Sequence, residues 1–156
     1  MIRAVLDTNV FVSGVLRFDT AQSPPGQILH HWLAGDVRVV TSAPLRREIE
    51  RTLANSSFAA RIPHAVGLRW LRSLDELAVP TEISLPVTGV ATHPEDDLIL
   101  ATAGSAAVDY LVTGDRQLQR LGVFEGAAIV SPGDFLDILI QSGAVETSAP
   151  RDSQPI

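Results

Sequence analysis

The chain has 156 residues, 46% of them hydrophobic and 19% charged, and its formal net charge is −6. This length and composition predict one globular domain with a sizeable core and exclude a disordered chain, while the absence of cysteine excludes disulfide bonds and thiolate metal sites. Asp7 interrupts the first apolar run and no later run is long enough to span a bilayer, so we expect a cytoplasmic protein without a signal peptide or a membrane partner.

The first part of the chain alternates between strand-like and helix-like apolar patterns. Residues 2–6 are apolar with almost no polar alternation, which is typical of a central strand in a parallel sheet. A helix is expected to begin near Val10, and the apolar spacing of residues 28–33 predicts another that ends at Gly35. Residues 37–40 form the second expected strand.

The same alternation continues to the end of the chain. Thr41 or Ser42 is expected to cap a helix that runs to about residue 54, with Pro44 in its first turn. The remaining expected elements are a helix from Pro63 to about residue 77 with Val66, Trp70, Leu74 and Leu77 inward, an irregular connection over 78–94 with one short extended piece, a helix over 95–107, a strand over 109–113, a short helix from Asp115, a strand over 127–130 and a helix from Pro132.

This order of elements predicts a fold class. Alternating strands and helices imply three layers, α/β/α, around a central parallel sheet of four to five strands with right-handed crossovers. We expect residues 1–141 to form this domain. Residues 142–156 are largely polar and contain prolines, so they are expected to be a flexible C-terminal tail.

Acidic residues stand where the expected strands end or helices begin. Asp7 directly follows the first strand, Asp115 follows the strand over 109–113, and Asp96 opens an apolar helix. Glu48 flanks the inner stripe of its helix. Ligands of open parallel α/β sheets bind beyond the carboxyl ends of the strands, and carboxylates gathered there repel one another unless a cation intervenes. Oxygen ligands suit Mg²⁺ or Mn²⁺, so the chain is a candidate metal-dependent phosphodiesterase.

Each acidic residue also has a simpler structural explanation, which the sequence leaves open. Asp7 and Asp115 are good helix N-caps, and Asp96 in a first turn complements the helix dipole. Glu48 stands close to Arg46 and Arg47 and can form an exposed ion pair. The set as a whole, rather than any one member, carries the metal hypothesis.

The motifs around these acids resemble, in order and spacing, those of the PIN domain family. The resemblance covers about residues 2–141 and is closest to the toxins of bacterial and archaeal toxin–antitoxin pairs, of the VapC type. It rests on Leu6-Asp7-Thr8-Asn9-Val10, Ser42-x5-Glu48, Asp96-Asp97-Leu98-Ile99-Leu100-Ala101-Thr102-Ala103, Val112-Thr113-Gly114-Asp115 and Ile129-Val130-Ser131-Pro132-Gly133-Asp134-Phe135-Leu136.

The resemblance implies a Mg²⁺- or Mn²⁺-dependent ribonuclease with an RNA substrate, an antitoxin partner protein and a homodimeric state. It gives the catalytic acids as Asp7, Glu48, Asp96 and Asp115, the metal ligands as Asp7, Asp96 and Asp115, and the positioning residues as Thr8, Asn9 and Thr113. One departure is His93-Pro94-Glu95-Asp96, where relatives often have Asp-x-x-Asp. Asp96 is preferred to Asp97 because it keeps the spacing to Ala101.

The basic residues are distributed unevenly. All twelve are arginine, and six of them lie between residues 46 and 72, in a protein that is acidic overall. We expect four to bind RNA phosphates: Arg46, Arg47, Arg69 and Arg72. The alternatives are a solvated helical face or a surface that docks an antitoxin.

Two other function classes are compatible with the fold class. A non-catalytic PIN-like module would bind RNA or protein, but loss of one or two acids would be expected in such a module. A phosphatase with a nucleophilic Asp would be expected to use a lysine, and this chain has none.

Overall fold

The computed structural model describes residues 1–20, 22–85, 87–91 and 93–148 of the chain. Six strands form one sheet in the order β3-β2-β1-β4-β6-β5, and all pair in parallel except β5, which is antiparallel to β6. The strands are β1 (Arg3–Leu6), β2 (Arg38–Ser42), β3 (Val79–Thr81), β4 (Tyr110–Val112), β5 (Val123–Phe124) and β6 (Ala127–Val130).

The sheet has more strands than the four to five expected from the sequence. Four expected strands are β1, β2, β4 and β6, and the short extended piece expected within 78–94 is β3. The additional strand is β5, which has only two residues and pairs at the edge through Val123 and Phe124. A strand this short has no periodicity of its own, so only its pairing with β6 reveals it.

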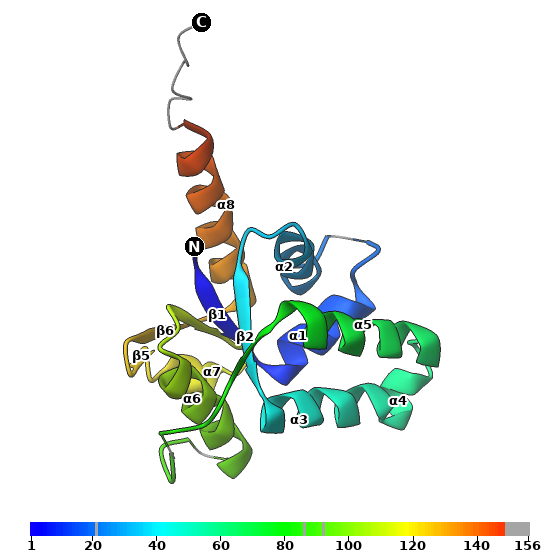
Figure 1. Ribbon diagram of the computed structural model, residues 1–156, viewed down its shortest axis with the longest axis horizontal. Coiled ribbons are helices and arrows are strands. Elements are labelled where there is room, and N and C mark those ends of the chain that lie inside the picture. Colours follow the sequence, from blue (N-terminus) through cyan, green and yellow to red (C-terminus); the bar gives the residue numbers. More distant parts are fainter. Residues whose placement is uncertain (21, 86, 92, 149–156) are drawn as a thin grey trace, which may run out of the picture.

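Helices cover both faces of the sheet and make the three layers expected. Helix α6 (Pro94–Ala106) contacts all strands from β1 to β5, whereas α1 (Thr8–Leu16) packs on α2 (Pro24–Leu33) and on α3 (Ala43–Ala54). Figure 1 shows α6 on one side of β1 and β2, and α1, α2 and α5 (His64–Leu77) on the other. Helix α8 (Pro132–Ser148) packs against α2.

Helices α3 and α5 form a lobe that projects from the sheet, with the short α4 (Ser56–Ala59) at its far end (Figure 1). The inner face of α5 is Gly67, Leu71 and Leu74, and Leu71 and Leu74 are 7% and 1% exposed. Leu77 was expected to face inward, but it is 53% exposed. It belongs to the last turn of α5, where Leu74 rather than Leu77 faces the core.

The strand order places a switch point beside β1. From β1 the chain moves outward to β2 and β3, and then returns to add β4 and β6 on the other side. Ligands of such sheets bind at the carboxyl ends of the two strands that flank this point. Here those strands are β1 and β4, which pair as Leu6 with Val112. The next residue, Asp7, donates its backbone N–H to the Val112 carbonyl at 2.9 Å.

Two buried hydroxyl groups join α6 to the start of α3. Ser42, 1% exposed, accepts the Leu45 N–H through Oγ and so caps α3 as expected. Its Oγ lies 2.8 Å from Oγ1 of Thr102, which is fully buried in α6. Thr102 donates to the Leu98 carbonyl at 2.9 Å. Because a hydroxyl has one hydrogen, Ser42 is then the donor to Thr102.

The C-terminal helix extends past the expected end of the domain. Helix α8 continues to Ser148, so residues 142–148, expected in a tail, are helical. The rest of that segment, residues 149–156, lies outside the described residues. In the described part of the chain, no helix combines the length and apolar character needed to cross a membrane.

Thr102→Val should destabilise the protein by roughly 1–3 kcal/mol, because the buried Ser42 hydroxyl loses its acceptor while side-chain volume is nearly unchanged. This corresponds to a fall in melting temperature of roughly 2–4 °C per kcal/mol. Urea denaturation of Thr102→Val, Ser42→Ala and the double variant measures the coupling. Thr52→Val, whose hydroxyl bonds only its own helix at the Glu48 carbonyl, is the control. Additive effects of the two substitutions would show that the pair does not join the helices.

Candidate active site at the carboxyl ends of the strands

Asp7 is a buried carboxylate at the switch point of the sheet. It is 8% exposed and occupies the N-cap position of α1, yet within the described chain its side chain makes no capping hydrogen bond. Its Oδ2 instead accepts the hydroxyl hydrogen of Thr113 at 2.7 Å, across the β1–β4 pair. The capping explanation for Asp7 is therefore wrong, because its carboxylate bonds Thr113 instead of the first turn of α1.

The surroundings of Asp7 disfavour its negative charge. Burial raises the pKa of Asp7 above its ordinary value of 3.8, and the nearby carboxylates of Asp96 and Asp115 raise it further. The Thr113 hydroxyl and the Thr8 backbone N–H offset part of this effect. Asp96 of α6 and Asp115, the cap of α7 (Arg116–Gln119), therefore both act electrostatically on Asp7 at the end of β1.

Asp115 is both a helix cap and a neighbour of Asp7. Its Oδ1 accepts the backbone N–H groups of Gln117 at 2.8 Å and Leu118 at 3.4 Å, so the capping explanation is right for this residue. Both bonds use Oδ1, which leaves Oδ2 as the oxygen for a ligand. The Asp115 N–H donates to Thr113 Oγ1 at 3.0 Å. Thr113 thus connects the Asp7 carboxylate to the backbone of Asp115 through one hydroxyl.

The structure separates the roles of the adjacent acids Asp96 and Asp97. Asp97 is 7% exposed, and its two oxygens accept the backbone N–H groups of Gly89 at 3.0 Å and Ala91 at 2.8 Å. It therefore holds the loop before α6. Asp96, half-buried in the first turn of α6, is the one whose charge acts on Asp7. The sequence also placed Asp96 rather than Asp97 in the site, and its role there stays a prediction.

Glu48 lies on α3 and, within the described chain, is not among the acids that raise the pKa of Asp7. It is half-buried on α3 and lines a groove of 510 Å³ that also includes Leu98 of α6, two residues after Asp96. The remaining lining residues are Pro44, Arg47, Arg51, Thr52 and Asn55. Glu48 therefore borders a cleft between α3 and α6.

The threonines and the asparagine expected to position the acids differ in their environment. Thr113 is fully buried and makes the bonds described above. Thr8 is 3% exposed, and its buried Oγ1 has no hydrogen-bond partner among the described residues. Asn9 is exposed. The orphaned hydroxyl beside Asp7 is a polar atom that a water or ion ligand could satisfy.

Sequence reasoning missed one residue that holds this group together. The side-chain Nε2 of Gln119 donates to the Thr113 carbonyl at 2.8 Å, from α7 back to the end of β4. This bond holds the turn that carries both Thr113 and Asp115. Nothing in the spacing of Gln119 reveals the contact, because a surface helix of four residues shows no periodicity.

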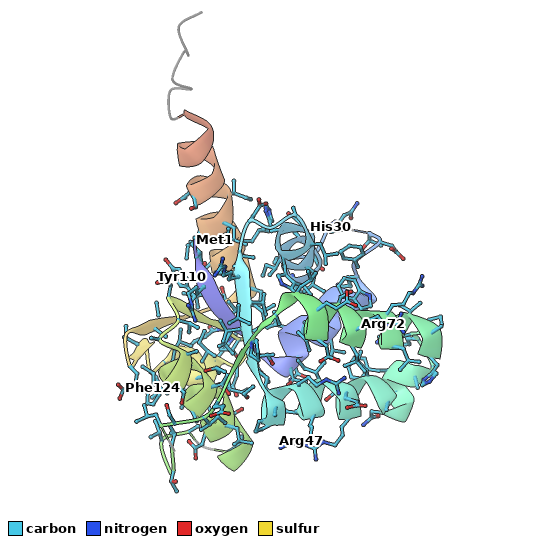
Figure 2. The ribbon with its side chains drawn as sticks, in the orientation of Figure 1. Met1, His30, Arg47, Arg72, Tyr110 and Phe124 are labelled. Atoms are coloured by element: carbon cyan, nitrogen blue, oxygen red, sulfur yellow. The ribbon has the colours of Figure 1, made fainter. Side chains whose placement is uncertain are left out.

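The expected RNA-binding arginines do not form one surface. Arg46 donates from Nε and Nη2 to the two oxygens of Asp75, both at 2.9 Å, and also pairs with Glu50. The hydrogen bond from Arg46 lowers the pKa of Asp75, so Arg46 is a bridge between α3 and α5. Arg69 and Arg72 are exposed on α5. Figure 2 shows Arg47 at the lower edge of α3 and Arg72 above it on α5.

The chemistry of the donor set fits a hard divalent cation. As they stand, no group of three or more acidic or histidine side chains in the described residues is arranged to hold a metal ion. The set nevertheless combines the mutually repelling carboxylates of Asp7, Asp96 and Asp115 with the unpartnered Thr8 hydroxyl. All of these offer oxygen, the ligand that Mg²⁺ and Mn²⁺ prefer.

Comparison with protein families gives the class of protein. The family model of the PIN domain matches residues 3–117, which is more than half of the chain and includes Asp7, Glu48, Asp96 and Asp115. The chain therefore belongs to the PIN domain family. A search of curated proteins returned no match. PIN domains are generally nucleases that act on nucleic acids and typically use divalent metals, which makes this chain a nuclease-type hydrolase.

In metal-free buffer, Asp7→Asn should raise the melting temperature at neutral pH, because it removes a buried charge that Asp96 and Asp115 repel. Because the pKa of Asp7 is higher in the folded protein than its ordinary value of 3.8, the ionised side chain lowers the free energy of unfolding. This destabilisation is fully present above the folded pKa and disappears below pH 3.8. The higher melting temperature of Asp7→Asn should therefore disappear as the pH is lowered. Thermal melts at a series of pH values from neutral to acidic measure this. Asp137→Asn, on the exposed surface of α8, is the control. A lower melting temperature for Asp7→Asn at neutral pH would contradict the electrostatic account.

Proposed function

We propose that this protein is a Mg²⁺- or Mn²⁺-dependent endoribonuclease and the toxin of a toxin–antitoxin pair. The observation that carries the nuclease assignment is the approach of Asp96 and Asp115 to the buried carboxylate of Asp7 at the switch point of the sheet. A protein keeps such a repulsive group when a cation or a substrate uses it. The family match and the resemblance of the motifs to VapC-type toxins support the substrate class.

In this proposal Asp7, Asp96 and Asp115 hold the metal, and Glu48 completes the catalytic acids from the side of α3. A bound divalent ion supplies positive charge to the scissile phosphate and lowers the pKa of an attacking water. Thr113 fixes the orientation of Asp7 through its 2.7 Å bond and, through its own hydroxyl, the N–H of Asp115. Thr8 and Asn9 follow Asp7 at the start of α1 and orient ligands beside it.

The toxin assignment rests on the resemblance of the motifs to the VapC type. This assignment implies that an antitoxin protein binds the toxin and blocks its site. It also implies that the protein is a homodimer. An adjacent gene encoding a small antitoxin-like protein would support this assignment. Co-expression of the two chains tests it directly, because the antitoxin should co-purify with the protein and inhibit RNA cleavage.

The purified protein should cleave single-stranded RNA in Mg²⁺ or Mn²⁺ and lose this activity in EDTA. Asp7→Asn should reduce the rate on the order of 100-fold or more, because it removes a charged ligand with little change in volume. Gel analysis of a labelled RNA measures both effects. Asp137→Asn, remote on α8, should retain full activity.

Cleavage that survives both chelation and Asp7→Asn would end the metal-nuclease proposal. Binding of RNA without cleavage under any metal would favour a non-catalytic PIN-like module.

Divalent cations should also stabilise the fold, independently of any RNA. An ion that binds only the native state adds about 2.7 kcal/mol to the free energy of unfolding when its free concentration is 100 times its dissociation constant. For a domain of this size, this raises the melting temperature by roughly 5–10 °C. Differential scanning fluorimetry with Mg²⁺ or Mn²⁺ measures the shift. Asp7→Asn and Asp115→Asn should lose most of it, whereas Asp137→Asn should keep it. An equal shift in all four proteins would place the ion elsewhere.

A further inference from the structure

Within the described part of the chain, the groove beside Glu48 presents two arginines that form none of the ion pairs found there. Arg47 and Arg51 are both exposed, and those ion pairs involve Arg46 and His31 instead. Arg46, the neighbour of Arg47, is bound to Asp75 and Glu50. The groove therefore offers two guanidinium groups that a ligand can reach, and Arg46 is excluded from this role by its own contacts.

The polar residues of the groove follow one face of α3. Arg47, Arg51 and Asn55 stand four residues apart, which places them in a row with steps of about 6 Å along the helix axis. The row leads from the middle of α3, next to Glu48, toward α4. A step of this length is comparable to the separation of successive phosphates in an extended single strand.

At the far end of this row, the side-chain amide of Asn55 is oriented by its own hydrogen bonds. Its Oδ1 accepts the Ser57 N–H at 3.1 Å and the Ser57 hydroxyl at 3.0 Å. With the oxygen used in this way, the amide nitrogen supplies the donors for a ligand. The opposite wall is Leu98 of α6, 44% exposed, which offers an apolar surface to a sugar or base.

We infer that this groove binds the phosphate backbone of single-stranded RNA and guides it to the acidic site, with Arg47 and Arg51 as the phosphate contacts. This inference rests on the proposed ribonuclease function. RNA is favoured over an acidic protein segment because the groove includes Glu48, one of the proposed catalytic acids, and Leu98, two residues after Asp96, and because its lining is mostly polar. Planar guanidinium groups bind phosphate oxygens in two places, and such contacts position a strand without reading its sequence.

The test measures binding of a fluorescein-labelled oligoribonucleotide of about a dozen nucleotides by anisotropy, over a range of salt concentrations. All proteins carry Asp7→Asn, which prevents cleavage. Arg47→Ala and Arg51→Ala should each weaken binding roughly two- to fivefold, as expected for exposed ion pairs. Each should reduce the slope of log affinity against log salt by about 0.7, and the double variant by about 1.4.

Two controls distinguish contact with the RNA phosphates from the effect of changing the net charge of the protein. Arg38→Ala removes the same charge at the amino end of β2, at the opposite end of that strand from α3, and should leave the slope unchanged. Arg47→Lys and Arg51→Lys keep the charge and should retain the slope while losing the planar fork. Unchanged thermal melts are expected for all of them, because alanine and lysine are good helix formers and both positions on α3 are exposed.

Three results would overturn the inference. The first is a salt slope that stays unchanged in the Arg47→Ala/Arg51→Ala double variant, while the protein without substitutions still cleaves RNA; the ribonuclease proposal would then stand. The second is weakened binding of an acidic peptide with unchanged RNA binding, which would make the groove a protein interface. The third is absence of RNA binding and cleavage in the unsubstituted protein, which would remove the proposed function as well.

Discussion

The arrangement of the site depends on the hydrogen bond from Thr113 to Asp7. The two residues are 106 positions apart in the chain, and the β1–β4 pairing at the switch point brings them together. A buried carboxylate is costly, and this bond compensates part of the cost while leaving the charge facing Asp96 and Asp115. The same Thr113 hydroxyl also receives the Asp115 N–H, and Gln119 holds the Thr113 carbonyl. One side chain therefore positions two of the proposed metal ligands.

The other acids reach the site through helix packing. Asp96 stands in the first turn of α6, and the buried Ser42–Thr102 pair ties that helix to the start of α3. Glu48 lies on α3, so the same hydroxyl pair sets the separation between the two helices that carry Asp96 and Glu48. Asp97 contributes by anchoring the loop before α6. Adjacent acids thus have different tasks, one electrostatic and one structural.

The charge of the α3–α5 lobe is divided in a similar way. Arg46 joins α3 to α5 through Asp75, so it contributes to the shape of the lobe. Arg47 and Arg51 line the groove that also contains Glu48. An overall acidic protein can attract a polyanion in this way, because the distribution of charge near the site matters more than its sum.

The sequence by itself determined the order of the longer elements, most helix boundaries and the PIN family, and it named the candidate acids, because periodicity and capping are local and the motifs keep their spacing. It missed the short helix α4. Only the tertiary structure decided that Asp7 does not cap its helix while Asp115 does, that Arg46 is bound to Asp75, and that Gln119 and Thr102 support the site. The very short strand β5 became visible only through pairing with its neighbour. The Arg46–Asp75 and Ser42–Thr102 contacts join groups far apart in the chain. The Gln119 and β5 contacts are closer in sequence but depend on how the intervening turns fold, and local patterns carry no information about which group a side chain will meet.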